Sequence, residues 1–429
     1  MSKNKIIIIA VIAVIVVIIG GIFLFGTKSD PLKKTELEFW GVFDDSDVYS
    51  SLIADFNKVF PNIKINYYKK SYADYEKDIL QAMATGRGPD IFAMHHTWFP
   101  RYADKIWAAP SEIISVKEVQ DEFVDVVAID FIVDGIVVAL PLSMDTLALY
   151  YNKDIFNSAG IPEPPETWEE FLDDVEKITI KDEQGNIIRA GASIGTARNV
   201  NRSTDIFSLL MLQSGTKIVS PDKDKAIFNE SVSINGESFY PGQRALQFYT
   251  DFASPLKSIY TWNNRMHYSI DSFYEGKTAM MFNYSYHLST IRAKSPYLNF
   301  AVAPMPQIKD SAQDINYANY WGLTVSRNCD DPNEAWQFIK WLSQKENTQK
   351  YLELSGTPTA RRDIIFSQKN DPDLGVFAEQ ALTARSWYQV DNFAIETILA
   401  DMVESVVLGQ SAIKQAIDKA TNQVSLLMK

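Results

Sequence analysis

The chain has 429 residues, of which 46% are hydrophobic and 22% charged, so it holds enough apolar material for two or three folded domains and is not a disordered chain. Its 54 acidic side chains against 41 basic ones give a formal net charge of −13. This balance argues against a nucleic-acid-binding protein, which needs a basic surface. The single cysteine, Cys329, excludes an intrachain disulfide and a zinc site built from cysteines.

The first predicted element is a membrane-spanning helix over residues 6–25. All 20 of these residues are apolar, and a helix of that length spans about 30 Å, the thickness of the hydrocarbon core. A signal peptide has a shorter apolar core and a small-residue cleavage site, whereas residues 23–25 read FLF. We therefore expect residues 1–27 to be an uncleaved, single-pass anchor in the cell membrane and residues 28–35 to be a tether. Cleavage and secretion are the alternative.

Strand and helix patterns alternate directly after the tether. The expected elements are strands at 36–40, 63–68 and 90–94 and helices at 48–60 and 72–85. This β-α-β-α-β order predicts an α/β domain with a mostly parallel sheet, which binds ligands at the carboxyl ends of its strands. The segments after the first and third strands, residues 41–47 and 95–99, are therefore candidate binding loops.

The α/β pattern continues along the chain and ends in helices. Thr167 and Glu170 form a capping box that opens a helix at 167–179, and residues 331–334 (DPNE) open another. Further strands are expected at 136–142, 147–152, 187–194, 278–283, 300–303 and 321–325.

Two short patterns look catalytic but lack the context that catalysis requires. Residues 191–195 (GASIG) match a nucleophile elbow, yet a polar segment without an apolar stripe follows them instead of a helix. Residues 276–278 (GKT) resemble the end of a phosphate-binding loop, yet Asp271 stands where its first Gly belongs. His95 and His96 are adjacent in an extended segment and are expected to point to opposite faces. We predict no enzyme, no cofactor and no metal site.

Aromatic side chains gather at the ends of the predicted strands. Flat rings cover the C–H faces of a sugar, while a few carboxylates hold its hydroxyls, so this composition points to a carbohydrate ligand. The rings and carboxylates at such positions are Trp40, Trp98, Tyr284, Tyr286, Trp321, Trp387, Asp44, Asp45 and Asp145. Core packing is the alternative interpretation for each ring.

Five stretches carry a family resemblance, in the same order over some 250 residues: 88–92, 140–153, 164–171, 273–280 and 320–339. They resemble, in turn, a G-x-x-P-D stretch, a first crossover with its Tyr-Asn-Lys strand, a P-x-T-W-x-E-F helix start, an F-x-x-G-K-x-A-M element and a third crossover. From about residue 35 to 429 the chain resembles the extracellular solute-binding proteins of ABC importers, in the group that includes maltose- and other oligosaccharide-binding proteins.

The resemblance implies a periplasmic-binding-protein-like fold, with two α/β lobes, three crossovers and the ligand in the cleft between the lobes. Lobe one would take residues 35–143 plus 284–327, and lobe two 146–281 plus 330–429. The implied hinge residues are Ser143, Met144, Asn283 and Ser326. The implied ligand contacts are Trp40, Asp44, Asp45, His95, His96, Trp98, Asp145, Tyr284, Tyr286, Trp321 and Trp387.

The expected protein is a monomer that captures a carbohydrate and delivers it to an ABC permease, without catalysis or cofactor. Trp321 is expected to form an aromatic platform for the ligand, with Gly322 leaving room for close approach. The alternatives are a sensor that hands a ligand to a membrane receptor, a binder of another solute such as a polyol phosphate, and a secreted enzyme, which the missing catalytic constellation disfavours.

Overall fold

The first lobe is built on a mixed sheet in the computed structural model, which describes residues 33–234 and 236–429. Strand β1 (Thr35–Gly41) pairs in parallel with β2 (Ile63–Lys69) and with β3 (Ile91–His95), as the alternating pattern predicts. Strand β17 (Trp321–Ser326) returns from far along the chain and lies antiparallel to β3. The short strands β4 (Ile106–Trp107) and β7 (Leu140–Pro141) pair with β17.

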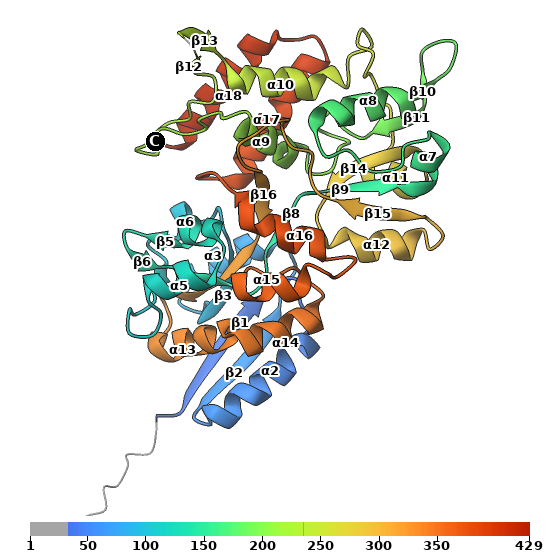
Figure 1. Ribbon diagram of the computed structural model, residues 1–429. Coiled ribbons are helices and arrows are strands. Elements are labelled where there is room, and N and C mark those ends of the chain that lie inside the picture. Colours follow the sequence, from blue (N-terminus) through green and yellow to red (C-terminus); the bar gives the residue numbers. More distant parts are fainter. Residues whose placement is uncertain (1–32, 235) are drawn as a thin grey trace, which may run out of the picture.

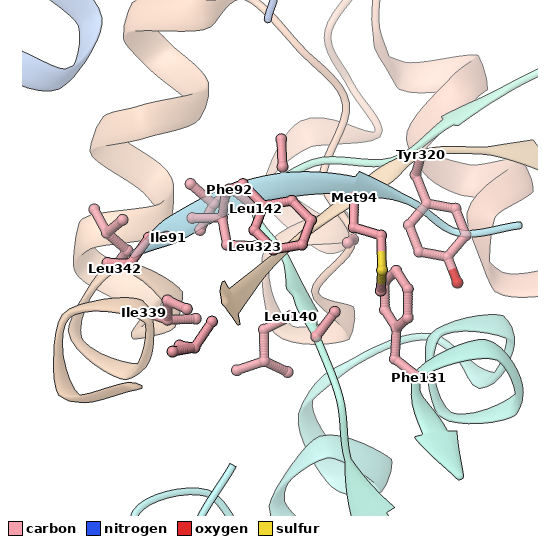
Figure 2. Packing of buried hydrophobic residues seen from close by; sticks show 14 of the residues in the cluster. Ile91, Phe92, Met94, Phe131, Leu140, Leu142, Tyr320, Leu323, Ile339 and Leu342 are labelled. Carbon is pink, nitrogen blue, oxygen red and sulfur yellow. The ribbon is translucent and has the colours of Figure 1, made fainter. Parts of the chain in front are cut away.

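Helices cover this sheet and enclose the core of lobe one. They include α2 (Ser46–Val59), α3 (Tyr75–Ala84), α13 (Pro332–Ser343) and α14 (Lys345–Ser355). Figure 2 shows part of the core, where Phe92 of β3 and Leu323 of β17 lie near Ile339 of α13.

The second lobe is built on a sheet with the strand order β10-β11-β14-β9-β15. Its strands are β9 (Ala148–Asn152), β10 (Ile180–Lys181), β11 (Ile187–Ala192), β14 (Thr278–Asn283) and β15 (Phe300–Ala303). Its main helices are α8 (Trp168–Ile178), α9 (Ser203–Gln213), α10 (Pro241–Asp251), α17 (Asn392–Val407) and α18 (Ile413–Leu427). The capping box of Thr167 and Glu170 is present at the start of α8, which confirms that prediction.

Shorter elements complete the two lobes. They are α4 (Phe99–Tyr102), α5 (Val116–Glu122), α6 (Asp125–Phe131), β5 (Ile132–Val133), β6 (Ile136–Val137), α7 (Lys153–Ser158), β12 (Val232–Ile234), β13 (Glu237–Phe239), α11 (Ser269–Tyr274), α12 (His287–Lys294), α15 (Arg362–Gln368), α16 (Gly375–Gln380) and η1 (Ala381–Thr383).

A small three-stranded sheet lies where the chain passes between the lobes (Figure 1). It consists of β8 (Asp145–Thr146), β16 (Asn316–Asn319) and β18 (Ala384–Arg385). The first passage leads from β7 through β8 to β9, and the second from β16 to β17. The third leads from α14 through α15, α16 and β18 to α17. Three passages join the lobes, as the resemblance implies.

The expected lobe boundaries differ from this arrangement at two places. Residues 284–327 were expected in lobe one, but β15 pairs with β9, so the chain stays in lobe two until β16. Residues 330–429 were expected in lobe two, but α13 and α14 bury Trp336 and Tyr351 in the core of lobe one. Both differences arise from long-range strand pairing and helix docking, which local sequence patterns do not encode.

Only two of the four expected hinge residues lie at a passage between the lobes. Ser143 and Met144 lie at the first passage, as expected. Asn283 instead ends β14 inside lobe two, and Ser326 ends β17 inside lobe one, so neither lies at a passage.

The predicted anchor at residues 6–25 lies outside the described residues. Within residues 33–234 and 236–429, no helix combines the length and apolar character needed to cross a membrane. In the same ranges, no three His, Cys, Asp or Glu side chains are grouped so that they could hold a metal ion.

Candidate ligand-binding cleft

A cavity of about 430 Å³ lies between the two lobes, and both lobes contribute to its walls. Lobe one supplies residues 41–44 after β1 and 95–98 after β3, which are the candidate binding loops at the carboxyl ends of these strands. Lobe two supplies side chains before and within α9, at 285–286 and on α17. Residues 142–145 of the first passage and 317–321 of the second also line the cavity. This volume falls within the usual range of small-molecule sites.

Aromatic rings form the lobe-one wall of the cavity. We name as the aromatic wall the residues Phe43, Tyr72, His95, Trp98 and Trp321. Trp321 opens β17 directly opposite His95 on β3, which places its indole in the centre of this wall. The ring centroids of Trp98, His95 and Phe43 lie 4.9, 5.2 and 5.4 Å from that of Trp321, all in edge-on geometry. Phe43 and Tyr72 are 57% and 63% exposed, so they can meet a ligand.

Two carboxylates of the cavity are held by donors of the protein itself. Asp44 accepts hydrogen bonds from the hydroxyls of Tyr351, at 2.9 Å, and Tyr49, at 3.3 Å. Burial raises the pKa of Asp44, while these hydroxyls lower it.

Asp145 accepts hydrogen bonds from the backbone N–H of Ser285, at 2.9 Å, and from its hydroxyl, at 2.6 Å. Burial raises the pKa of Asp145 to about 6. This carboxylate ties the first passage to the loop after β14.

The two adjacent histidines both line the cavity, which corrects the expectation that they point to opposite faces. β3 ends at His95 and the backbone turns there, so the two rings lie 4.3 Å apart. His95 contacts Thr97 Oγ1 at 2.7 Å and Asn319 Oδ1 at 3.1 Å. His96 stacks on Tyr320, and its Nδ1 lies 3.2 Å from the Tyr320 carbonyl oxygen. Burial lowers the pKa of His95 to about 4 and that of His96 as well, so both rings are neutral near pH 7.

The lobe-two wall combines one guanidinium with two carboxylates. Arg202 has a left-handed backbone conformation (φ 59°) and donates from Nε and Nη2 to the Tyr286 hydroxyl, at 3.0 and 2.7 Å. Its Nη1 lies 3.9 Å from Asp205 Oδ2, which also accepts a hydrogen bond from Tyr284 at 2.8 Å. Glu396 of α17 accepts one hydrogen bond, from Asn392 at 2.9 Å. Burial and then the charge of Asp205 raise the pKa of Glu396 to about 7.

Residues 43–349 match the model of a protein family described as bacterial extracellular solute-binding protein. The chain belongs to this family. Among curated proteins it is similar to the galactooligosaccharide-binding protein of Bacillus subtilis, with 23% identity over 402 residues, which cover 90% of this chain and 88% of that protein. It is also similar to the maltotriose-binding protein of Pyrococcus abyssi, with 22% identity over 338 residues, which cover 77% of this chain and 66% of that protein.

Solved structures show the same fold. The cyclic alpha-maltosyl-1,6-maltose binding protein from Arthrobacter globiformis superposes with a TM-score of 0.76 at 20% identity, over 92% of this chain and 99% of that one. The sugar-binding protein MalE from Xanthomonas citri gives a TM-score of 0.76 at 19% identity, over 92% and 97% of the two chains. Membership of the family confirms an extracellular solute-binding role and agrees with the expectation that the chain is not an enzyme.

In this solute-binding protein, four of the expected contact residues lie outside the cavity lining. Trp40 is buried on the other side of β1, where the Lys70 ammonium lies 3.6 Å from its ring centroid. Asp45 is exposed and forms an ion pair with Lys69. Tyr284 and Trp387 are buried in the core of lobe two, which is the packing alternative stated for each ring. The remaining seven line the cavity: Asp44, His95, His96, Trp98, Asp145, Tyr286 and Trp321.

Gly322 does not leave room for a ligand, contrary to expectation. A Cβ at this position would lie 2.6 Å from the Phe131 ring and 2.9 Å from the Ala139 Cβ. The missing side chain therefore admits the core of lobe one, not a ligand.

The lining residues that were not anticipated include Phe43, Tyr72, Arg202, Asp205 and Glu396. Phe43 lies inside the candidate loop 41–47, so its position in the sequence could have predicted that it lines the cavity. No local sequence pattern predicts that Arg202 or Glu396 binds a ligand. Arg202 lies in an irregular loop, and Glu396 is a charged residue on a helix, where such residues ordinarily face solvent.

Proposed function

We propose that this protein is the extracytoplasmic substrate-binding subunit of an ABC importer. It captures a carbohydrate, most simply an oligosaccharide, in the cavity between its lobes and delivers it to a membrane permease. The observation that carries this proposal is the aromatic wall of lobe one facing polar side chains of lobe two across a single cavity. The names of similar proteins, which bind galactooligosaccharides and maltotriose, support the same ligand class.

The geometry suits a saccharide for two physical reasons. The rings around Trp321 can bury the C–H faces of sugar units, which removes apolar surface from water. The carboxylate of Asp44, the Asn319 amide and the Tyr286 hydroxyl supply acceptors and donors for sugar hydroxyls around these rings.

The charges of the lining residues argue against a phosphorylated solute. Among the described residues of the cavity, Arg202 carries the one permanent positive charge, and it lies beside Asp205. A polyol phosphate would therefore meet more negative than positive charge.

A thermal-shift panel of mono- and oligosaccharides tests the proposal. A ligand at 100 times its dissociation constant adds about 2.7 kcal/mol to the free energy of unfolding and raises the melting temperature. We expect at least one saccharide to do so and phosphorylated polyols not to. If other solutes raise the melting temperature and no saccharide does, the carbohydrate assignment is wrong.

We also propose that residues 6–25 hold the two lobes at the outer face of the cell membrane. The length of the apolar run and the missing cleavage signal support this proposal. Mass spectrometry of the mature chain should find residues 6–25 in the membrane fraction. A mature chain that starts near residues 27–35 in a soluble extracellular fraction would contradict it.

A further inference from the structure

The cavity is acidic. Four carboxylates line it, those of Asp44, Asp145, Asp205 and Glu396, against the single guanidinium of Arg202 among the described lining residues. The two lining histidines add no positive charge, because burial lowers the pKa of both. Partial exclusion of water strengthens the resulting negative potential, which favours cationic ligands over anionic ones.

The four carboxylates are not equally satisfied. The protein supplies two hydroxyl donors to Asp44, and three donors to Asp145 from Ser285 and Thr146. Asp205 and Glu396 receive one hydrogen bond each, on Oδ2 and Oε1. Within residues 33–234 and 236–429, Asp205 Oδ1 and Glu396 Oε2 accept none.

Arg202 offsets only part of the negative charge of this pair. Two of its N–H groups donate to the neutral Tyr286 hydroxyl, and its approach to Asp205 is 3.9 Å, longer than a hydrogen bond. Burial raises the pKa of both carboxyl groups, that of Glu396 to about 7, so near neutral pH the two groups are not both fully ionised. An ammonium group at the free acceptor atoms Asp205 Oδ1 and Glu396 Oε2 would stabilise the ionised form of both carboxyl groups.

One buried polar atom of the residues that line the cavity has no partner within the described part of the protein. His96 is 95% buried, and its Nδ1–H is directed to the carbonyl oxygen of Tyr320. Its Nε2 is then the unprotonated acceptor, and this buried atom has no hydrogen-bond partner in the described part of the chain. Because this atom exposes almost no surface to the cavity, a ligand there does not reach it, and the proposed selectivity rests on Asp205 and Glu396.

We propose that the cleft selects a saccharide that carries a protonated amine, with Asp205 and Glu396 as the carboxylates that receive it. This specificity rests on the proposed carbohydrate function. The aromatic wall is compatible with such a ligand, because the faces of Trp, Tyr and Phe rings attract cations as well as sugar C–H groups.

The test compares matched ligands on the full chain by titration calorimetry near neutral pH. The probes are glucosamine, galactosamine, mannosamine and β-1,4-linked glucosamine oligomers, each against its N-acetylated form, which lacks the charge. We expect at least one amine form to bind at least tenfold more tightly than its N-acetylated partner, a difference of about 1.4 kcal/mol.

Variants then assign the preference to the carboxylates. Glu396→Gln should reduce the ratio of the two affinities to less than threefold, whereas Glu396→Asp, which keeps the charge, should retain most of it. Glu379→Gln, an exposed carboxylate on α16 outside the cavity, is the matched control and should change nothing. If Glu396→Gln fails to fold, Asp205→Asn provides the same test.

The inference is wrong if no amine form exceeds its partner by threefold, or if a folded Glu396→Gln variant keeps the full preference. If the N-acetylated sugars bind as well as the amines, the proposed carbohydrate function stands and only the charge selectivity fails. If no saccharide of either form binds, while another class of solute does, both fail.

Discussion

Replacing Trp321 by alanine should weaken saccharide binding at least tenfold. The indole lies in the centre of the aromatic wall and lines the cavity. Losing one such platform typically costs about 1.5–3 kcal/mol of binding free energy, which is about 10- to 150-fold in affinity. The same change should also lower stability, because the ring contacts Tyr75 and Trp98 of lobe one. Since Trp321 is only partly buried, we expect a loss of about 2–3 kcal/mol, below that of a fully buried tryptophan.

The assay must separate these two effects on the same sample. Titration calorimetry with a saccharide from the panel measures affinity, and chemical denaturation measures the free energy of unfolding. Trp107→Ala is the matched control, because Trp107 is also partly buried in lobe one but packs against Arg327 outside the cavity. It should lose stability and keep its affinity. A folded Trp321→Ala variant that binds within threefold of the parent would refute the platform.

Three further predictions concern stability and motion. Burial raises the pKa of Asp130 to about 7, so its folded form holds a proton more tightly than the unfolded chain does; stability should fall as pH rises from about 4 to 7. Asp130→Asn should reduce that fall by up to about 4 kcal/mol between pH 4 and 7, measured by denaturation at several pH values. An unchanged profile would contradict the assignment of the fall to Asp130. Gly322→Ala should lower the free energy of unfolding by about 1–3 kcal/mol, because the new methyl group overlaps the Phe131 ring. A variant as stable as the parent would show that the core of lobe one repacks around the methyl group, and would contradict this prediction. Saturating ligand should close the lobes about the three passages and reduce the radius of gyration in small-angle scattering; an unchanged radius with calorimetrically confirmed binding would exclude closure.

Local patterns in the sequence predicted the elements of the fold and part of the site. Alternating strand and helix signals placed β1, β2 and β3, and the rule that ligands bind at the carboxyl ends of strands led directly to Asp44 and Trp98. These signals succeed because hydrophobic periodicity and capping are local properties of the chain.

The remaining features depend on contacts between distant residues. Whether β15 belongs to lobe one or two depends on its pairing with β9, which nothing within 300–303 determines. Trp40 and Trp321 both stand at strand ends, yet only Trp321 faces the cavity, because the side of the sheet that a ring occupies follows from the tertiary fold. Glu396 entered the site only through the docking of α17 against α9.

Hydrogen–deuterium exchange with and without a saturating saccharide tests most directly whether the ligand binds between the two lobes. The account predicts that exchange slows on both walls together, in residues 41–44 after β1 and in residues 202–205 at the start of α9, with the surface of α18 unchanged as an internal reference. Protection of one wall alone, or of neither while calorimetry reports binding, would contradict it.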